Sequence, residues 1–440
     1  MTAQEPRRMR LGMLIGGVGN HQGAWRRPES RVEEITSLSL FTDLAHWAEA
    51  AKIDALFMAD GLTLETQRIK AGPYGHLEPV TLLSALAART ERIGFIGSVS
   101  TTFTEPYNLA RQMASLDHIS GGRAAWNIVT SAWGEVNFGV PLPSHADRYV
   151  RAAEFVEVVT ALWDSWADDA VLADRAGGTY ALPERVRRID HVGEHFRVEG
   201  PLNVPRSPQG RPVLVQAGSS ADGKNFAARY AEVVFTAQQT LADSQAFYRD
   251  LKARVAKAGR DPEKVKILPG VSPIVAPTEA EAQALATELR ELINVEVGLE
   301  RLQKQLGGVD LSGLDLDGTI PPELLPPIET VQGRQSRYGV FKELAVTEKY
   351  SIRRLIEMEV SSSGHWVPIG SPEQIADLLT ERFTQRGCDG FVLLPAYIPE
   401  GVQLLTDAVI PILRERGLFR EEYEGVTLRE NLGLDRPAAR

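Results

Sequence analysis

The sequence is poor in cysteine, with Cys388 as the single one in 440 residues. One cysteine cannot form an internal disulfide, which suits a reducing compartment, so we expect a cytoplasmic protein. Because Cys388 directly precedes an apolar run, we expect its thiol to be buried by packing. Long apolar runs are missing too. The apolar run within residues 1–17 is too short for a signal peptide. No segment reaches about 18 consecutive apolar residues, so we predict no membrane span.

An excess of positive charge is also absent. Asp and Glu number 58 against 48 Lys and Arg, which gives a net charge of −10 and a pI of about 5.5. An acidic chain without a basic stripe binds polyanions poorly, which excludes nucleic acid and anionic membranes as expected partners. The apolar fraction of 43% and the charged fraction of 24% are typical of a globular protein with a sizeable core.

Several motifs that identify enzyme classes do not occur. The eight histidines show no metal-binding spacing such as HExxH, and a single cysteine cannot form CxxC, so we predict no metal site. The nucleophile elbow G-x-S-x-G is missing. The fingerprint G-x-G-x-x-G is missing as well, so no internal NAD(P)H-binding domain is predicted.

Apolar runs alternate with amphipathic segments along the whole chain. The runs are continuous rather than alternating, as strands buried on both faces require. The eight predicted strands span 10–17, 54–60, 92–99, 123–129, 212–217, 232–236, 265–275 and 390–395. This alternation predicts an α/β fold with a parallel sheet, and the count of eight favours a closed (β/α)8 (TIM) barrel; a doubly wound open sheet has the same alternation.

Two intervening segments show clear helical signals. Segment 106–119 begins at a proline and stops before two glycines. Segment 147–166 places five apolar residues on one predicted face. These residues are Val150, Phe155, Val158, Val159 and Leu162.

Two stretches exceed the simple strand–helix repeat. We expect a single barrel domain over 1–440 with insertions at about 167–211 and 298–350. The first holds a predicted hairpin at 188–198 within a loop rich in proline and glycine. The second lies between the seventh and eighth strands, and a long loop at that place favours a mobile lid.

The clearest short motif is Ala217–Lys224, which joins the fifth predicted strand to a helix at 221–230. Small residues let the backbone approach a ligand, and unpaired helix N–H groups with the hydroxyls of Ser219 and Ser220 form an anion site. The residues Gly218 to Lys224 also match the P-loop pattern G-x-x-x-x-G-K. A P-loop needs Ser or Thr at the next position to bind magnesium, and this chain has Asn225 there. An ordinary strand-to-helix turn capped by serine is the other interpretation.

Polar residues end or interrupt three further strands. Asp60 ends the second, where it faces a barrel mouth or caps the next helix. Thr101 ends the third, where its hydroxyl reaches a ligand or caps a turn. Asn127 lies inside the fourth among apolar neighbours, and its buried amide needs a partner, either a polar ring system or a neighbouring backbone.

Three ring side chains complete the set of candidates. His145 and Tyr149 are four residues apart near a helix start, so they share a face and suit a phosphate, although an ordinary surface pair has the same spacing. His21 follows the first strand and is placed to line the mouth.

A family resemblance rests on several of these stretches together. They are His21–Arg26, Phe57–Gly61, Glu78–Pro79, 100–131, Asn137–Gly139, His145–Tyr149, 200–220, 389–399 and the tail 417–434. They resemble the bacterial-luciferase-like flavin monooxygenases, and within them the group of nitrilotriacetate monooxygenase component A, dimethyl-sulfide monooxygenase and dibenzothiophene-sulfone monooxygenase. The resemblance spans nearly the whole chain. One departure is Ala132–Val136, where the bulky Trp133 is positioned to project toward the substrate.

The resemblance implies a (β/α)8 barrel that receives reduced FMN (FMNH2) from a separate NAD(P)H:flavin oxidoreductase and assembles as a homodimer or homotetramer. It implies that Asp60 and Thr101 lie near the isoalloxazine and ribityl chain and Asn127 against the ring. The phosphate would be held by His145, Tyr149, Ser219 and Ser220. His21 would be a catalytic residue, a hydrogen-bond donor on the substrate side.

The implied reaction is a monooxygenation. One atom of O2 enters a small organic substrate and the other leaves as water, while the protein binds, orients and dries the site. The resemblance of the C-terminal segment 417–434 implies an organosulfur substrate, a sulfone or sulfide. Two alternatives stay open: a deazaflavin-dependent reductase or dehydrogenase of the same superfamily, which needs no O2, and a non-catalytic flavin-binding barrel.

Overall fold

The protein is described by a computed structural model that covers residues 7–73 and 77–439. The first six residues of the N-terminal stretch analysed above lie outside the described part. Within that part, no helix is long and apolar enough to cross a membrane.

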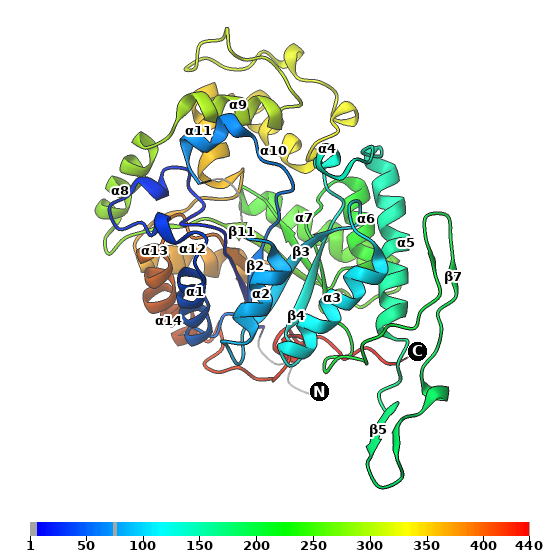
Figure 1. Ribbon diagram of the computed structural model, residues 1–440. Helices are drawn as coiled ribbons and strands as arrows, with labels where there is room; N and C mark the ends of the chain where they lie inside the picture. Colours follow the sequence, from blue (N-terminus) through cyan, green and yellow to red (C-terminus); the bar gives the residue numbers. More distant parts are fainter. Residues whose placement is uncertain (1–6, 74–76, 440) are drawn as a thin grey trace.

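Eight parallel strands close into a barrel, which confirms the predicted fold class (Figure 1). Each predicted strand overlaps one of them, and only β3 extends beyond its predicted range, by one residue. The strands are β1 (Arg10–Leu14), β2 (Ala55–Met58), β3 (Gly94–Ser100), β4 (Ala124–Val129), β9 (Val213–Gln216), β10 (Val233–Thr236), β11 (Lys266–Val271) and β14 (Gly390–Leu393). The order around the barrel is β1-β14-β11-β10-β9-β4-β3-β2. Closure rests on the parallel pairing of β1 with both β14 and β2.

Helices surround the barrel and follow most of its strands. They are α1 (Leu38–Ala50), α2 (Pro79–Ala87), α3 (Pro106–Ile119), α4 (Glu135–Phe138), α5 (His145–Trp163), α6 (Ala221–Tyr230), α7 (Leu241–Lys257), α8 (Glu279–Glu291), α12 (Pro372–Thr384), α13 (Glu400–Leu404) and α14 (Ile410–Glu415). Helices α3 and α6 have the predicted bounds. The prediction for Val150 was wrong: it is 55% exposed, because five residues before Phe155 is about 140° around a helix. The other four residues of that face are buried, as is Cys388.

The segment between α5 and β9 forms two antiparallel hairpins outside the barrel (Figure 1). The first pairs β5 (Val171–Asp174) with β6 (Thr179–Ala181). The second pairs β7 (His191–Val192) with β8 (Arg197–Val198) and lies within the predicted hairpin.

The segment between β11 and β14 contains α9 (Val295–Gln305), α10 (Gln335–Val346) and α11 (Ile352–Ser362). We call residues 295–362 the helical excursion. It has a hydrophobic cluster of its own, with Tyr338 and Phe341 fully buried. A short parallel pair, β12 (Ile274–Val275) with β13 (Ile369–Gly370), flanks it. The excursion covers the end of the barrel where the strands terminate, since Lys304 pairs with Glu65 after β2.

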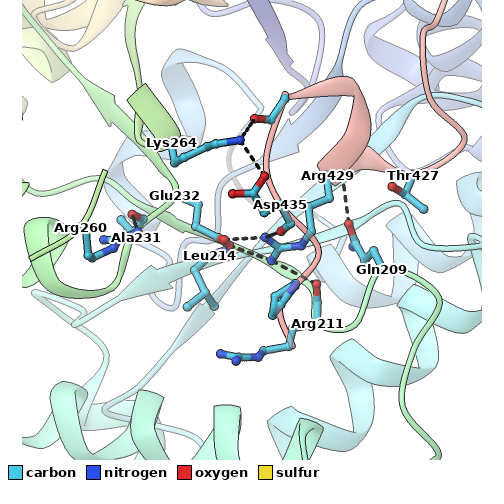
Figure 2. Close-up of polar contacts among 12 residues, drawn as sticks. Gln209, Arg211, Leu214, Ala231, Glu232, Arg260, Lys264, Thr427, Arg429 and Asp435 are labelled. Atoms are coloured by element: carbon cyan, nitrogen blue, oxygen red, sulfur yellow. Dashed lines mark hydrogen bonds and ion pairs between the residues drawn. The ribbon is translucent and has the colours of Figure 1, made fainter. Parts of the chain in front are cut away.

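The opposite end of the barrel is sealed by the C-terminal tail, which contains α15 (Leu428–Asn431). Leu428, Leu432 and Leu434 join the cluster of side chains that fills the barrel interior. Figure 2 shows how polar contacts hold the tail: Arg429 forms a two-pronged ion pair with Glu232, at 2.5 and 2.9 Å, and its backbone N–H donates to Gln209.

A second, fully buried ion pair anchors the tail. Arg420 Nη2 lies 2.6 Å from Asp54 Oδ1, and the two side chains are 1% and 2% exposed. Asp54 also accepts the backbone N–H of Leu11. The tail is therefore tied directly to the starts of β1 and β2.

We expect Arg420→Met to destabilise the fold by about 3–5 kcal/mol, because it leaves the Asp54 carboxylate buried without its partner. The free energy of unfolding in urea measures this. The matched control is Arg416→Met, which removes an exposed pair with Asp377 and should cost less than about 1 kcal/mol. Equal losses in the two variants would show that the buried pair does not anchor the tail.

Candidate active site

The loop after β9 brings two glycines into close contact. A Cβ on Gly218 would stand 2.4 Å from Gln216 Nε2 and 2.7 Å from Tyr149 Oη, and one on Gly223 would stand 2.9 Å from the Gly218 carbonyl carbon. No side chain fits at either position, so the backbone forms a tight turn at the start of α6. This contact explains the spacing of the motif, which the sequence alone left open to a P-loop interpretation.

Ser220 is the N-cap of α6, and its Oγ accepts from Gly223 N at 3.1 Å. Ser219 precedes it and is partly exposed. The first amides of the helix and these two hydroxyls therefore lie at one positive helix end. Lys224 turns away and pairs with Asp250 at 2.5 Å, so it does not serve the loop as a P-loop lysine would.

Helix α5 supplies the other side of this anion site. The rings of His145 and Tyr149 lie 5.2 Å apart, as their spacing predicts, and the Tyr149 hydroxyl is hydrogen-bonded to Ser220 and Thr130. Burial raises the pKa of Tyr149, which remains a neutral donor. Burial, and then Arg148, lower the pKa of His145, against the opposing effect of Asp222 at 3.4 Å.

Asn127 points into the barrel, because its neighbour Trp126 packs outward on Phe155 of α5 and strand side chains alternate. Its Nδ2 donates to Ser98 Oγ at 2.7 Å, but its buried Oδ1 has no hydrogen-bond partner. No neighbouring backbone group donates a hydrogen bond to Asn127 Oδ1. An unmet buried acceptor carries a free-energy cost that a donor from a ligand would remove.

The hydroxyls that end β3 are used within the protein. Ser100 Oγ accepts from the N–H groups of Thr102 and Phe103, which is a capping role. Thr101 is buried and donates to the Val129 carbonyl at 3.2 Å, which leaves its oxygen as an acceptor.

Asp60 does not cap a helix. The next helical turn has Glu65 as its N-cap, and α2 has Glu78. The Asp60 carboxylate faces open space at the mouth. Partial loss of hydration, and then the Glu78 carboxylate, raise the pKa of Asp60.

These positions share one half of the mouth. Asp60, Thr101, Asn127 and Ser219–Ser220 belong to β2, β3, β4 and β9 or to the loops after them, and these four strands are neighbours in the barrel. His21 belongs to the other half, beside the loop after β14, where its N–H donates to the Ala396 carbonyl. Burial, and then Arg290, lower the pKa of His21 to about 4, so the ring is neutral at pH 7. Nδ1 accepts from Gly23 N at 3.0 Å, which leaves the ring proton on Nε2 as a donor.

Sequence reasoning missed Arg148. It lies on α5 beside Tyr149, is buried, and donates from Nη2 to the Gln332 carbonyl of the helical excursion at 3.0 Å. Its Nε and Nη1 atoms are buried without a hydrogen-bond partner. Its place one residue before Tyr149 was visible in the sequence, but its burial depends on the excursion folding back over α5.

Trp133 lies under the same excursion. Lys304 and Arg334 stand over its ring, 4.7 and 5.5 Å from the centroid. Among the described residues, no three His, Cys, Asp or Glu side chains cluster closely enough to hold a metal ion.

A family profile, related sequences and solved structures all match this chain over most of its length. A profile of the family described as luciferase-like monooxygenase matches residues 9–390. N-acetyl-S-(2-succino)cysteine monooxygenase of Bacillus subtilis (strain 168) is 46% identical, over 100% of this chain and 99% of that protein. Nitrilotriacetate monooxygenase component A of Aminobacter aminovorans is 47% identical, over 98% and 97%. Among solved structures, riboflavin lyase with modified FMN and riboflavin superposes with a TM-score of 0.87 at 31% identity, covering 99% of this chain and 98% of that chain.

The contact between the two glycines generates a stability prediction. Gly218→Ala should destabilise the protein by about 1–3 kcal/mol, because the new methyl group has no room beside Gln216 and Tyr149. Gly313→Ala is the control, since a Cβ there meets no atom within 4 Å. Unfolding in urea compares the two variants, and an unchanged midpoint for Gly218→Ala would contradict the close approach.

Proposed function

The chain belongs to the family of luciferase-like monooxygenases, and on that premise we propose that it is the FMNH2-dependent oxygenase of a two-component system. A separate NAD(P)H:flavin oxidoreductase supplies the reduced flavin. The substrate is a small organic molecule, and organosulfur compounds are the first candidates, because the relative in Bacillus subtilis is named for a sulfur-bearing substrate. We also propose that the protein is a homo-oligomer and that it is located in the cytoplasm, where NAD(P)H is available to the reductase.

The observation that carries this proposal is the arrangement on the β2–β3–β4–β9 half of the mouth. We place a phosphate at the loop Gly218–Ser220, where the first amides of α6 lie and Ser219, Ser220 and Tyr149 supply hydroxyl groups. His145 adds a ring donor on the α5 side. Each of these groups donates, as an anion requires.

We place the flavin ring between Asp60 and Asn127. An isoalloxazine carries an imide N–H, and Asn127 Oδ1 is a buried acceptor without a partner. Thr101, with its oxygen still able to accept, ends β3 and so lies between Asn127 of β4 and Asp60 after β2 in the strand order. A mononucleotide would therefore satisfy the unmet acceptor of Asn127 at one end and meet hydroxyl groups and helix amides at the other.

Reduced FMN, when bound, activates O2 and supplies the oxygen atom that enters the substrate. The residues of this chain bind and orient, and they exclude water. Tyr149, Ser219 and Ser220 hold the phosphate, while the Arg148–Gln332 hydrogen bond keeps the helical excursion closed over α5 as a lid. His21, with a neutral ring, donates from Nε2 on the substrate side rather than acting as an acid at pH 7.

Oxygen-uptake measurements test this function. The purified chain is mixed with a generic NAD(P)H:flavin reductase, NADH and FMN, and a panel of sulfides, sulfones and aminopolycarboxylates is added. We expect no NADH oxidation without the reductase. With the reductase, we expect at least one compound of the panel to be oxygenated, and the amount of H2O2 released to fall accordingly. Reduction of a substrate without O2 would instead support a deazaflavin-type reductase. Release of H2O2 alone with every compound would support a non-catalytic flavin-binding barrel.

The phosphate site has a separate test. The double variant Ser219→Ala/Ser220→Ala should weaken reduced-FMN binding about tenfold or more, because hydrogen bonds to a charged group are each worth about 1.5–3 kcal/mol. Anaerobic fluorescence titration measures the affinity. Ser371→Ala, which removes the N-cap of α12, is the matched control and should bind FMN normally. Unchanged affinity in the double variant would place the phosphate elsewhere.

A further inference from the structure

The half of the mouth opposite the proposed flavin site has its own polar centre, at His365. Phe57 of β2 and Phe235 of β10 meet edge to face, 5.3 Å apart, although their strands are four places apart in the closed order. The two rings therefore meet across the barrel interior. His365 stacks on Phe235 at 4.9 Å, and a Cβ on Gly270 of β11 would stand 2.3 Å from its Nδ1. His365 thus lies beside β10 and β11.

His365 positions an arginine of the helical excursion. Arg337 Nη2 is hydrogen-bonded to His365 Nε2. Because a guanidinium only donates, Nε2 must accept and the ring proton must be on Nδ1. Burial, and then Arg337 and Arg334, lower the pKa of His365 well below its usual value, so the ring is neutral. The positive charge of this pair is that of Arg337 alone.

Among the described residues, no carboxylate forms an ion pair with Arg337. Arg337 Nη1 is buried without a hydrogen-bond partner. Arg334 is close enough to repel it, and the carboxylate that attracts it, Glu359, already forms an ion pair with Arg301 at 3.2 Å. Withdrawing a guanidinium from water without a counter-ion carries a large free-energy cost, which an incoming anion would remove.

The space beside this segment is large enough for a small molecule. Residues 330–333, which lie just before α10 in the chain, line a cavity of about 620 Å³ together with Trp133 and Lys304. Cavities of this size hold small organic ligands. Arg334 and Lys304 both stand over the ring of Trp133, and Asp310 is the acidic residue of the cavity lining.

We propose, building on the oxygenase function above, that the substrate carries a carboxylate group and that Arg337, held by neutral His365, binds it. The forked donors of Arg337 match the two oxygens of a carboxylate, with Nη2 fixed by His365 and Nη1 free for the anion. The carboxylate then anchors the substrate on the β10–β11 side, opposite the flavin. The reacting atom of the substrate extends from that anchor toward the flavin half.

The test measures binding, so it does not depend on turnover. Isothermal titration calorimetry of the full chain with saturating FMN uses two probes, nitrilotriacetate and N-acetyl-S-(2-succino)cysteine, and the trimethyl ester of each. We expect the wild type to bind at least one acid and neither ester. Arg337→Gln should weaken acid binding about tenfold or more, with FMN affinity changed less than about twofold.

Two further variants make the result decisive. Arg353→Gln, which removes an exposed ion pair with Asp317 on the same excursion, should bind the acid as the wild type does. Arg337→Lys keeps the charge but loses the fork, so it should bind about threefold more weakly and folds even where the glutamine variant does not.

The proposal is overturned if the wild type binds neither acid, if an ester binds as tightly as its acid, or if Arg337→Gln leaves acid affinity unchanged. It is also overturned if Arg337→Gln weakens FMN and acid together, which would assign Arg337 to the flavin phosphate. Acid binding that depends on Arg337 without oxygenated product from either acid would count against the oxygenase function and leave the carboxylate site standing.

Discussion

Closure of the sheet between β1, β2 and β14 is the constraint from which the rest of the structure follows. In a closed parallel barrel every strand ends at the same mouth, so residues far apart in sequence become neighbours there. The same closure creates an interior that must be filled and a second end that must be sealed. The tail residues Leu428, Leu432 and Leu434 meet that need, and the buried Arg420–Asp54 pair holds them in place.

The mouth is divided between two kinds of chemistry. The β2–β3–β4–β9 half offers hydroxyl groups, the first amides of α6 and the Asp60 carboxylate, with an unmet acceptor at Asn127. The β10–β11 half and the helical excursion above it carry Arg337, whose buried Nη1 has no hydrogen-bond partner. The two buried histidines near the mouth, His21 and His365, are both kept neutral by burial. Such a site binds and orients anions in a dry environment and needs little proton transfer from the protein.

The helical excursion completes the site without being part of the barrel. Its own hydrophobic cluster allows it to hold a shape apart from the sheet. Polar contacts connect it to the barrel side, among them Arg148 to the Gln332 carbonyl, Lys304 to Glu65 and Gln22 N–H to the Val360 carbonyl. A separate hydrophobic cluster joined by such contacts is consistent with the lid proposed above.

Local patterns in the sequence determined the eight strands, the bounds of α3 and α6 and the small-residue loop at Gly218, because hydrophobic runs and turn residues act over a few positions. The tertiary structure alone decided which residues face each other: Val150 turned outward, the tail became a plug, and Arg148, Arg337 and His365 gathered at the mouth. Their roles depend on burial and on partners tens to hundreds of residues away. Whether a charge is compensated is a property of the packed molecule, and no local pattern contains it.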